Sequence, residues 1–63
     1  MNNNSDLMID TLVETENYTI WRADEPDQES TFHLELNNVT VHFFREEWDE
    51  FVELAKRLLE SNY

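Results

Sequence analysis

Residues 31–44 read Thr-Phe-His-Leu-Glu-Leu-Asn-Asn-Val-Thr-Val-His-Phe-Phe, and they carry the clearest structural signal in the chain. Apolar and polar residues alternate over 31–36 and again over 39–44, which is the period of a β-strand. Asn37 and Asn38 separate the two runs, and asparagine tolerates the positive φ that a type I′ turn requires. The stretch therefore predicts a β-hairpin with a two-residue turn.

The position of this turn determines which residues face each other across the hairpin. One side becomes wholly apolar, with the pairs Leu36 and Val39, Leu34 and Val41, and Phe32 and Phe43. The other side receives the mixed pairs Glu35 and Thr40, His33 and His42, and Thr31 and Phe44. A shift of one residue would exchange the two sides, so the apolar pattern specifies the register. Function on this hairpin is expected on the mixed side.

Downstream of the hairpin the apolar period becomes helical. Apolar residues recur at steps of three and four, at Trp48, Phe51, Val52, Ala55, Leu58 and Leu59, and Leu54 widens this stripe. Acidic residues fill the first turns while Lys56 and Arg57 come near the end, which matches the helix dipole. We expect a helix from Arg45 to about Ser61, with Phe44 in the capping position that Ser, Thr or Asp usually occupies.

The segments before residue 31 are harder to interpret. Residues 17–23 are rich in β-branched and aromatic side chains and predict a strand, whereas residues 24–29 are polar, contain Pro26 and predict a loop. Residues 5–13 alternate like a strand but also show helical apolar spacing behind a possible N-cap at Ser5. We favour a short helix there and expect residues 1–5 to be disordered.

These elements predict one α+β domain over residues 1–63. Its architecture would be a three-stranded antiparallel β-meander packed by a C-terminal amphipathic helix, with a possible short N-terminal helix. A chain of 63 residues buries only about 60% of its unfolded surface, and the absence of cysteine excludes disulfides. We expect eight aromatic residues, Trp48 among them, and self-association to supply the rest of the core.

The net charge of the chain restricts the kinds of partner that it can bind. Fifteen Asp and Glu against four Lys and Arg leave a net charge of −11, which repels nucleic acids and anionic membranes. The acidity is read as a solvated surface, as adaptation to high salt, or as mimicry of a phosphate backbone. No stretch has the features of a signal peptide or a membrane span, so we expect a cytoplasmic protein that forms a homodimer or binds a protein partner.

A resemblance supports the second reading of the acidity. The segment 39–51, Val-Thr-Val-His-Phe-Phe-Arg-Glu-Glu-Trp-Asp-Glu-Phe, with Glu-Asn-Tyr-Thr-Ile-Trp at 16–21, resembles small uncharacterised acidic proteins of halophilic archaea. The likeness lies in composition and in the strand-to-helix pattern. It implies a cytoplasm rich in salt and no known activity, so it transfers no functional residue.

Few patterns in the chain indicate chemistry. Without glycine there is no phosphate-binding loop and no nucleophile elbow, and the serines lie in polar stretches with no base nearby. We therefore expect no enzymatic activity and no cofactor. One candidate metal site consists of His33, His42 and Glu35 on the mixed side of the hairpin. Trp21 and Phe44 are candidate interface residues, because aromatic residues on a sheet surface often form contacts.

The leading functional interpretation is a non-catalytic accessory module for protein–protein interaction, which self-associates or serves as an adaptor. Two alternatives belong to other classes. One is an acidic inhibitor that mimics nucleic acid toward a basic protein, and the other is a divalent-metal site on the hairpin.

Overall fold

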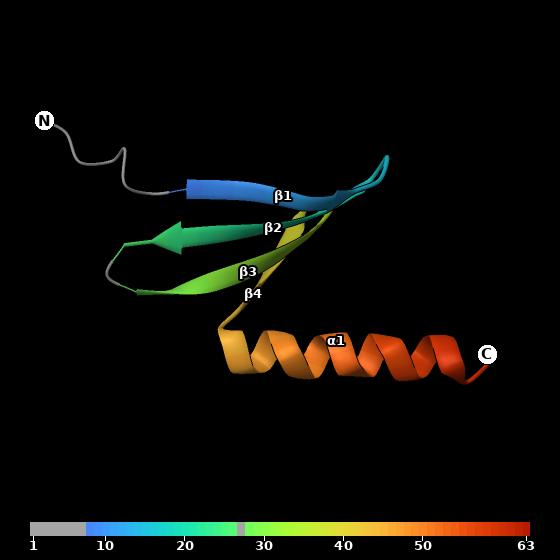
Figure 1. Cartoon of the computed structure of the whole chain (residues 1–63). Helices are drawn as coiled ribbons and strands as arrows, with labels where there is room; N and C mark the ends of the chain where they lie inside the picture. Colours follow the sequence, from blue (N-terminus) through green and yellow to red (C-terminus); the bar gives the residue numbers. More distant parts are fainter. Residues whose placement is uncertain (1–7, 27) are drawn as a thin grey trace, which may run out of the picture.

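The computed structural model describes residues 8–26 and 28–63. These residues form four strands and a helix, in the order β1 Met8–Glu14, β2 Tyr18–Glu25, β3 Gln28–Leu36, β4 Val39–Phe43 and α1 Arg45–Glu60. The strands make one antiparallel sheet in the order β1-β2-β3-β4 (Figure 1). The predicted α+β class and C-terminal helix are confirmed, but the meander has four strands rather than three.

The central hairpin has the predicted register. β3 and β4 pair Leu36 with Val39 through to Phe32 with Phe43, so the apolar and mixed sides are as expected. The predicted turn type is wrong, because only Asn37 has a positive φ, at 52°, whereas a type I′ turn needs one at both central residues. The pair of Thr31 with Phe44 does not form, since β4 ends at Phe43.

The predicted N-terminal helix is a strand. β1 pairs with β2, and the register shifts between Thr11 and Val13, so that Leu12 has no partner. A bulge of this kind inserts one residue and interrupts the alternation of side chains. The insertion brings Val13 to the same side of the sheet as Met8, which strict alternation would not do. Ser5, proposed as the cap, and the predicted disorder of residues 1–5 lie outside the described residues.

The predicted loop over residues 24–29 is mostly strand, and Pro26 lies in the short turn between β2 and β3. Polar contacts account for Asp24 at the start of this stretch. The Arg22 guanidinium forms ion pairs with Asp10 at 3.3 Å and Asp24 at 3.2 Å, and the Ser30 hydroxyl donates a hydrogen bond to Asp24. The contacts of Arg22 with Asp10 and of Ser30 with Asp24 join neighbouring strands, and such cross-strand pairs let a polar segment extend a sheet.

The helix begins and ends with local hydrogen bonds. At its start the Glu47 carboxylate accepts a hydrogen bond of 2.9 Å from the Phe44 backbone N–H, which supplies half of a capping box although Phe44 itself has no capping oxygen. At its end the Ser61 N–H donates to the carbonyl oxygens of Arg57 and Leu58, and Asn62 follows with φ 58°. Left-handed asparagine is a common helix terminator.

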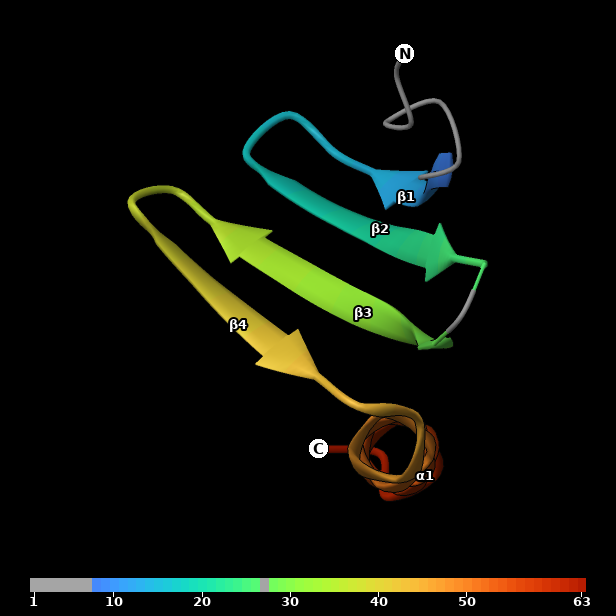
Figure 2. The same cartoon turned by 90° about the vertical axis from the view of Figure 1, so that its left-hand side faces the viewer.

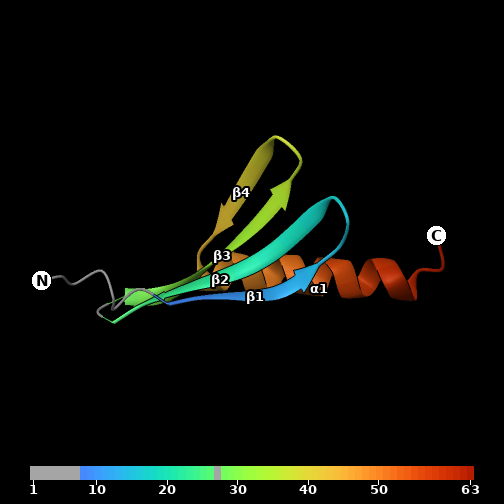
Figure 3. The same cartoon turned by 90° about the horizontal axis from the view of Figure 1, so that it is seen from above.

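Aromatic rings join the helix to the sheet. Trp48 stacks on Phe32 with ring centroids 5.0 Å apart, and Phe43 contacts both Trp48 and Phe51. Among residues 8–26 and 29–63, only Phe32 is buried, with 3% of its surface exposed. Figure 2 looks along α1 and shows it following β4 in the strand order, while in Figure 3 the β3–β4 hairpin points away from the helix axis. The core is therefore small and lies where α1 begins.

Candidate functional site

The mixed side of the sheet brings the two histidines together. His33 and His42 are cross-strand partners, and their Nδ1 atoms lie 2.6 Å apart. The other ring nitrogen of His33, Nε2, lies 3.0 Å from the Thr31 hydroxyl, and Trp21 stacks on the His33 ring with centroids 3.9 Å apart. Three strands thus contribute to one polar and aromatic cluster.

This geometry is that of a shared proton. A neutral imidazole has one N–H and one lone pair, so one histidine donates to the other through Nδ1. Two nitrogens bound to one tetrahedral zinc ion would lie roughly 3.3 Å apart, given Zn–N bonds of about 2.0 Å. Glu35 lies on the same side, opposite Thr40. Within the described ranges no three His, Cys, Asp or Glu side chains group as metal ligands.

The environment of His33 also affects its charge. Partial burial lowers the pKa of His33 below its ordinary value of 6.5, and repulsion from His42 lowers it further. Desolvation disfavours the charged ring, and a second positive ring nearby has the same effect. Both effects favour the neutral form of the His33 ring.

The two candidate interface residues have different surroundings. Trp21 is half-buried beneath its stacking partner His33. Phe44 is 66% exposed at the start of α1, because the chain leaves the sheet one residue earlier than the hairpin pattern predicts. In the part of the chain that the structure describes, no aromatic contact joins Trp21 to Phe44.

The opposite side of the sheet has an uncovered apolar surface, called the apolar face below. It consists of two rows that cross the sheet, Val13–Ile20–Leu34–Val41 and Tyr18–Leu36–Val39. Charged residues on this side occur in the next rows, at Asp10, Arg22 and Asp24. Val13, Tyr18, Val39 and Val41 are exposed, so this apolar surface has no cover within the described chain.

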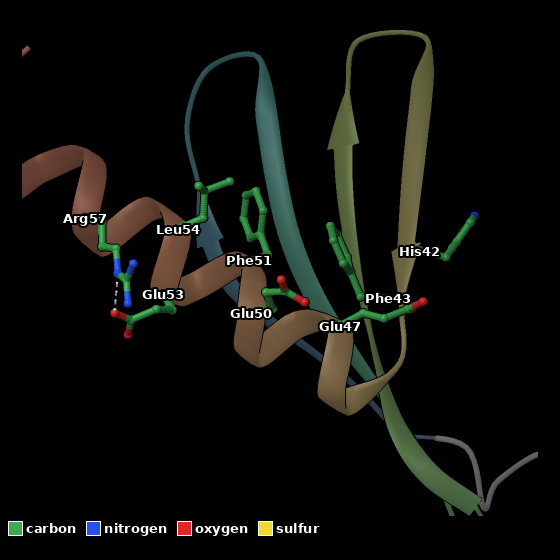
Figure 4. A pocket seen from close by; sticks show the side chains of 8 residues that line it. All are labelled: His42, Phe43, Glu47, Glu50, Phe51, Glu53, Leu54 and Arg57. Carbon is green, nitrogen blue, oxygen red and sulfur yellow. Dashed lines mark hydrogen bonds and ion pairs between the residues drawn. The ribbon is translucent and has the colours of Figure 1, made fainter.

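An open groove of about 670 Å³ lies between β4 and α1. Phe43, Phe51 and Leu54 supply its apolar surface, and the remaining lining residues are His42, Glu47, Glu50, Glu53 and Arg57. Figure 4 shows Phe51 and Leu54 rising from the helix on the side of the strands, while Arg57 and Glu53 point elsewhere. Arg57 pairs with Glu53 at 3.0 Å, and Glu50 forms no ion pair with any of the described residues.

Sequence reasoning did not identify this groove. Leu54 was expected only to widen the apolar stripe of α1, yet it is 65% exposed in the groove. One signal in the sequence could have indicated the groove. Leu54 lies at the margin of the apolar stripe, and charged residues stand four positions before it and three positions after it. The groove also needs β4, whose position relative to α1 depends on tertiary packing.

Neither a membrane-spanning helix nor a similar protein provides information on function. No helix among the described residues is long and apolar enough to cross a membrane. No family model, no curated protein and no solved structure matches this chain significantly, so the candidate site rests on its own geometry.

Proposed function

We propose that this chain is a non-catalytic protein–protein interaction module that associates with a second copy of itself through the apolar face. One observation carries the proposal. Phe32 is the one buried residue in the described part of the chain, whereas thirteen large apolar side chains there are exposed. Large apolar patches that remain exposed mark interaction sites in soluble proteins.

The distribution of charge favours a second copy as the partner. The chain has a net charge of −11, so two copies repel each other over most of their surfaces. The two rows of the apolar face contain no charged residue. Contact through this face therefore avoids placing carboxylates of the two copies against one another.

The available area is also sufficient. Each partner in a standard interface contributes about 800 Å². Val13, Tyr18, Val39 and Val41 on the sheet are joined by Leu54, Leu58 and Leu59 on α1, and all are between 39% and 72% exposed. Seven large side chains in this state provide an area of that order. Their burial would add to a core that now contains one residue.

A matched pair of substitutions on β4 tests the proposal. Val41→Lys places a charge on the apolar face, and Thr40→Lys places the same charge on the opposite side of the same strand. Light scattering over a range of concentrations should show the first variant as a monomer and the second as a dimer. Circular dichroism checks that both variants fold. Equal association of two folded variants would contradict the proposal.

A further inference from the structure

We infer that the groove between β4 and α1 receives the same helix of the second copy in antiparallel orientation, with Leu54 against the partner's Leu54. In this arrangement Arg57 lies beside the partner's Glu50, and by symmetry Glu50 lies beside the partner's Arg57. The inference rests on the proposed self-association and adds a contact between the two α1 helices, beside β4, to the contact through the apolar face.

The first support is the make-up of one flank of α1. Glu47, Glu50, Leu54 and Arg57 follow one another at steps of three and four, so they share a helix surface, and all line the groove. Leu54 is 65% exposed between these charged residues. In paired helices, charged residues beside an apolar contact determine the orientation of the partner.

The second support is the order of charges along this flank. Its first half is acidic, at Glu47 and Glu50, and its second half contains Arg57. A parallel arrangement would place Glu50 against the partner's Glu50. An antiparallel arrangement about Leu54 places Glu50 near the partner's Arg57 instead, which favours that orientation over the parallel one.

The third support is spacing. Glu50 precedes Leu54 by four residues and Arg57 follows it by three, so a two-fold axis at Leu54 aligns the two charges within one residue. One residue corresponds to about 1.5 Å along the helix axis, which long side chains readily span. Arg57 is free to turn, because its present pair with Glu53 lies on the solvent-exposed surface of α1.

Cysteine crosslinking tests the arrangement, and the chain contains no native cysteine to interfere. Leu54→Cys should link two copies through a short bismaleimide. Val52→Cys is the matched control, because Val52 is 46% exposed on the same helix but does not line the groove. Efficient linking at residue 54 with little at residue 52 is expected. A dimer by light scattering that links equally or better at residue 52 would overturn the inference while leaving the proposed self-association intact.

A charge exchange provides a second readout. Glu50→Arg and Arg57→Glu should each weaken dimerisation several-fold, because each places like charges together across the two-fold axis. The double variant should restore it, since opposite charges meet again. A general effect of net charge predicts otherwise, as Glu50→Arg makes the chain less acidic. If the double variant does not regain dimerisation, the antiparallel pairing is contradicted. If the unsubstituted chain stays monomeric, both this inference and the proposed function are contradicted.

Discussion

The Nδ1 atoms of His33 and His42 lie 2.6 Å apart across the β3–β4 pair, on the side of the sheet opposite the apolar face. One proton suffices for this contact, and a proton on both nitrogens would disrupt it. Trp21, Thr31 and Glu35 border the pair on the same side of the sheet. Glu35 is the charged group there that would partly offset the repulsion.

This contact predicts that the fold loses stability in mild acid. The pKa of His33 is lowered in the folded chain, so the unfolded chain binds more protons as the pH falls. The contribution is fully present above about pH 6.5, the unfolded value, and is lost as the pH falls through the lower folded value. Urea titrations between pH 8 and 5.5 measure the change. His33→Gln should flatten this dependence, and an unchanged slope would argue against the shared proton.

The stacking of Phe32 on Trp48 predicts a second result. Phe32→Ala removes the one buried side chain of the described chain, at a cost of about 3–5 kcal/mol. A chain of this length has a total stability of only about 3–9 kcal/mol. The variant should therefore melt at a much lower temperature than the unsubstituted chain when unfolding is followed by circular dichroism. Phe44→Ala, at a residue that is 66% exposed, should change stability by less than about 1 kcal/mol. Equal melting of the two variants would contradict the described core.

The turn between β3 and β4 offers a test within two adjacent residues. Asn37 has φ 52°, in the left-handed region, whereas Asn38 does not. Because a side chain with a Cβ is disfavoured there, Asn37→Ala should cost about 1–2 kcal/mol, and Asn38→Ala should cost less than half as much. Chemical denaturation measures both. A larger loss at Asn38 would place the left-handed residue at the second position instead.

The net charge of −11 predicts that salt stabilises the fold. The Debye length falls from about 10 Å at 0.1 M to about 3 Å at 1 M, which relieves repulsion among the carboxylates. Thermal midpoints at fixed protein concentration should rise with sodium chloride, and Glu46→Gln should reduce the slope. A flat or falling midpoint would contradict self-repulsion. A rise that continues into molar salt would support the proposed adaptation to high salt.

The parts of the fold that the sequence predicts are those determined by local patterns. The pairing of His33 with His42 follows from two alternating runs and a two-residue turn, and α1 follows from a helical period with its charges in order. The β1 segment was predicted as a helix because the bulge at Leu12 is invisible in the pattern. Asp24 lies in a strand because it is the register partner of Met8 and forms an ion pair with Arg22. The sequence of a polar segment does not indicate such contacts by itself.

The candidate site is less predictable than the fold. The sequence places Phe44 in the capping position of α1, as the structure does, but it does not indicate that Trp21 stacks on His33. It predicts the apolar stripe of α1, but the extent to which the sheet covers Leu54 depends on the angle between helix and strands. Only the tertiary arrangement shows that so much of the apolar surface stays exposed.

Sedimentation equilibrium of the unsubstituted chain tests the central claim most directly. Self-association predicts a mass near twice 7.7 kDa at micromolar concentrations, with tighter association as salt screens the carboxylates. A mass of 7.7 kDa that persists at high micromolar protein and in molar salt would contradict it. The apolar face would then be uncovered in the isolated protein, and the second copy would not be its partner.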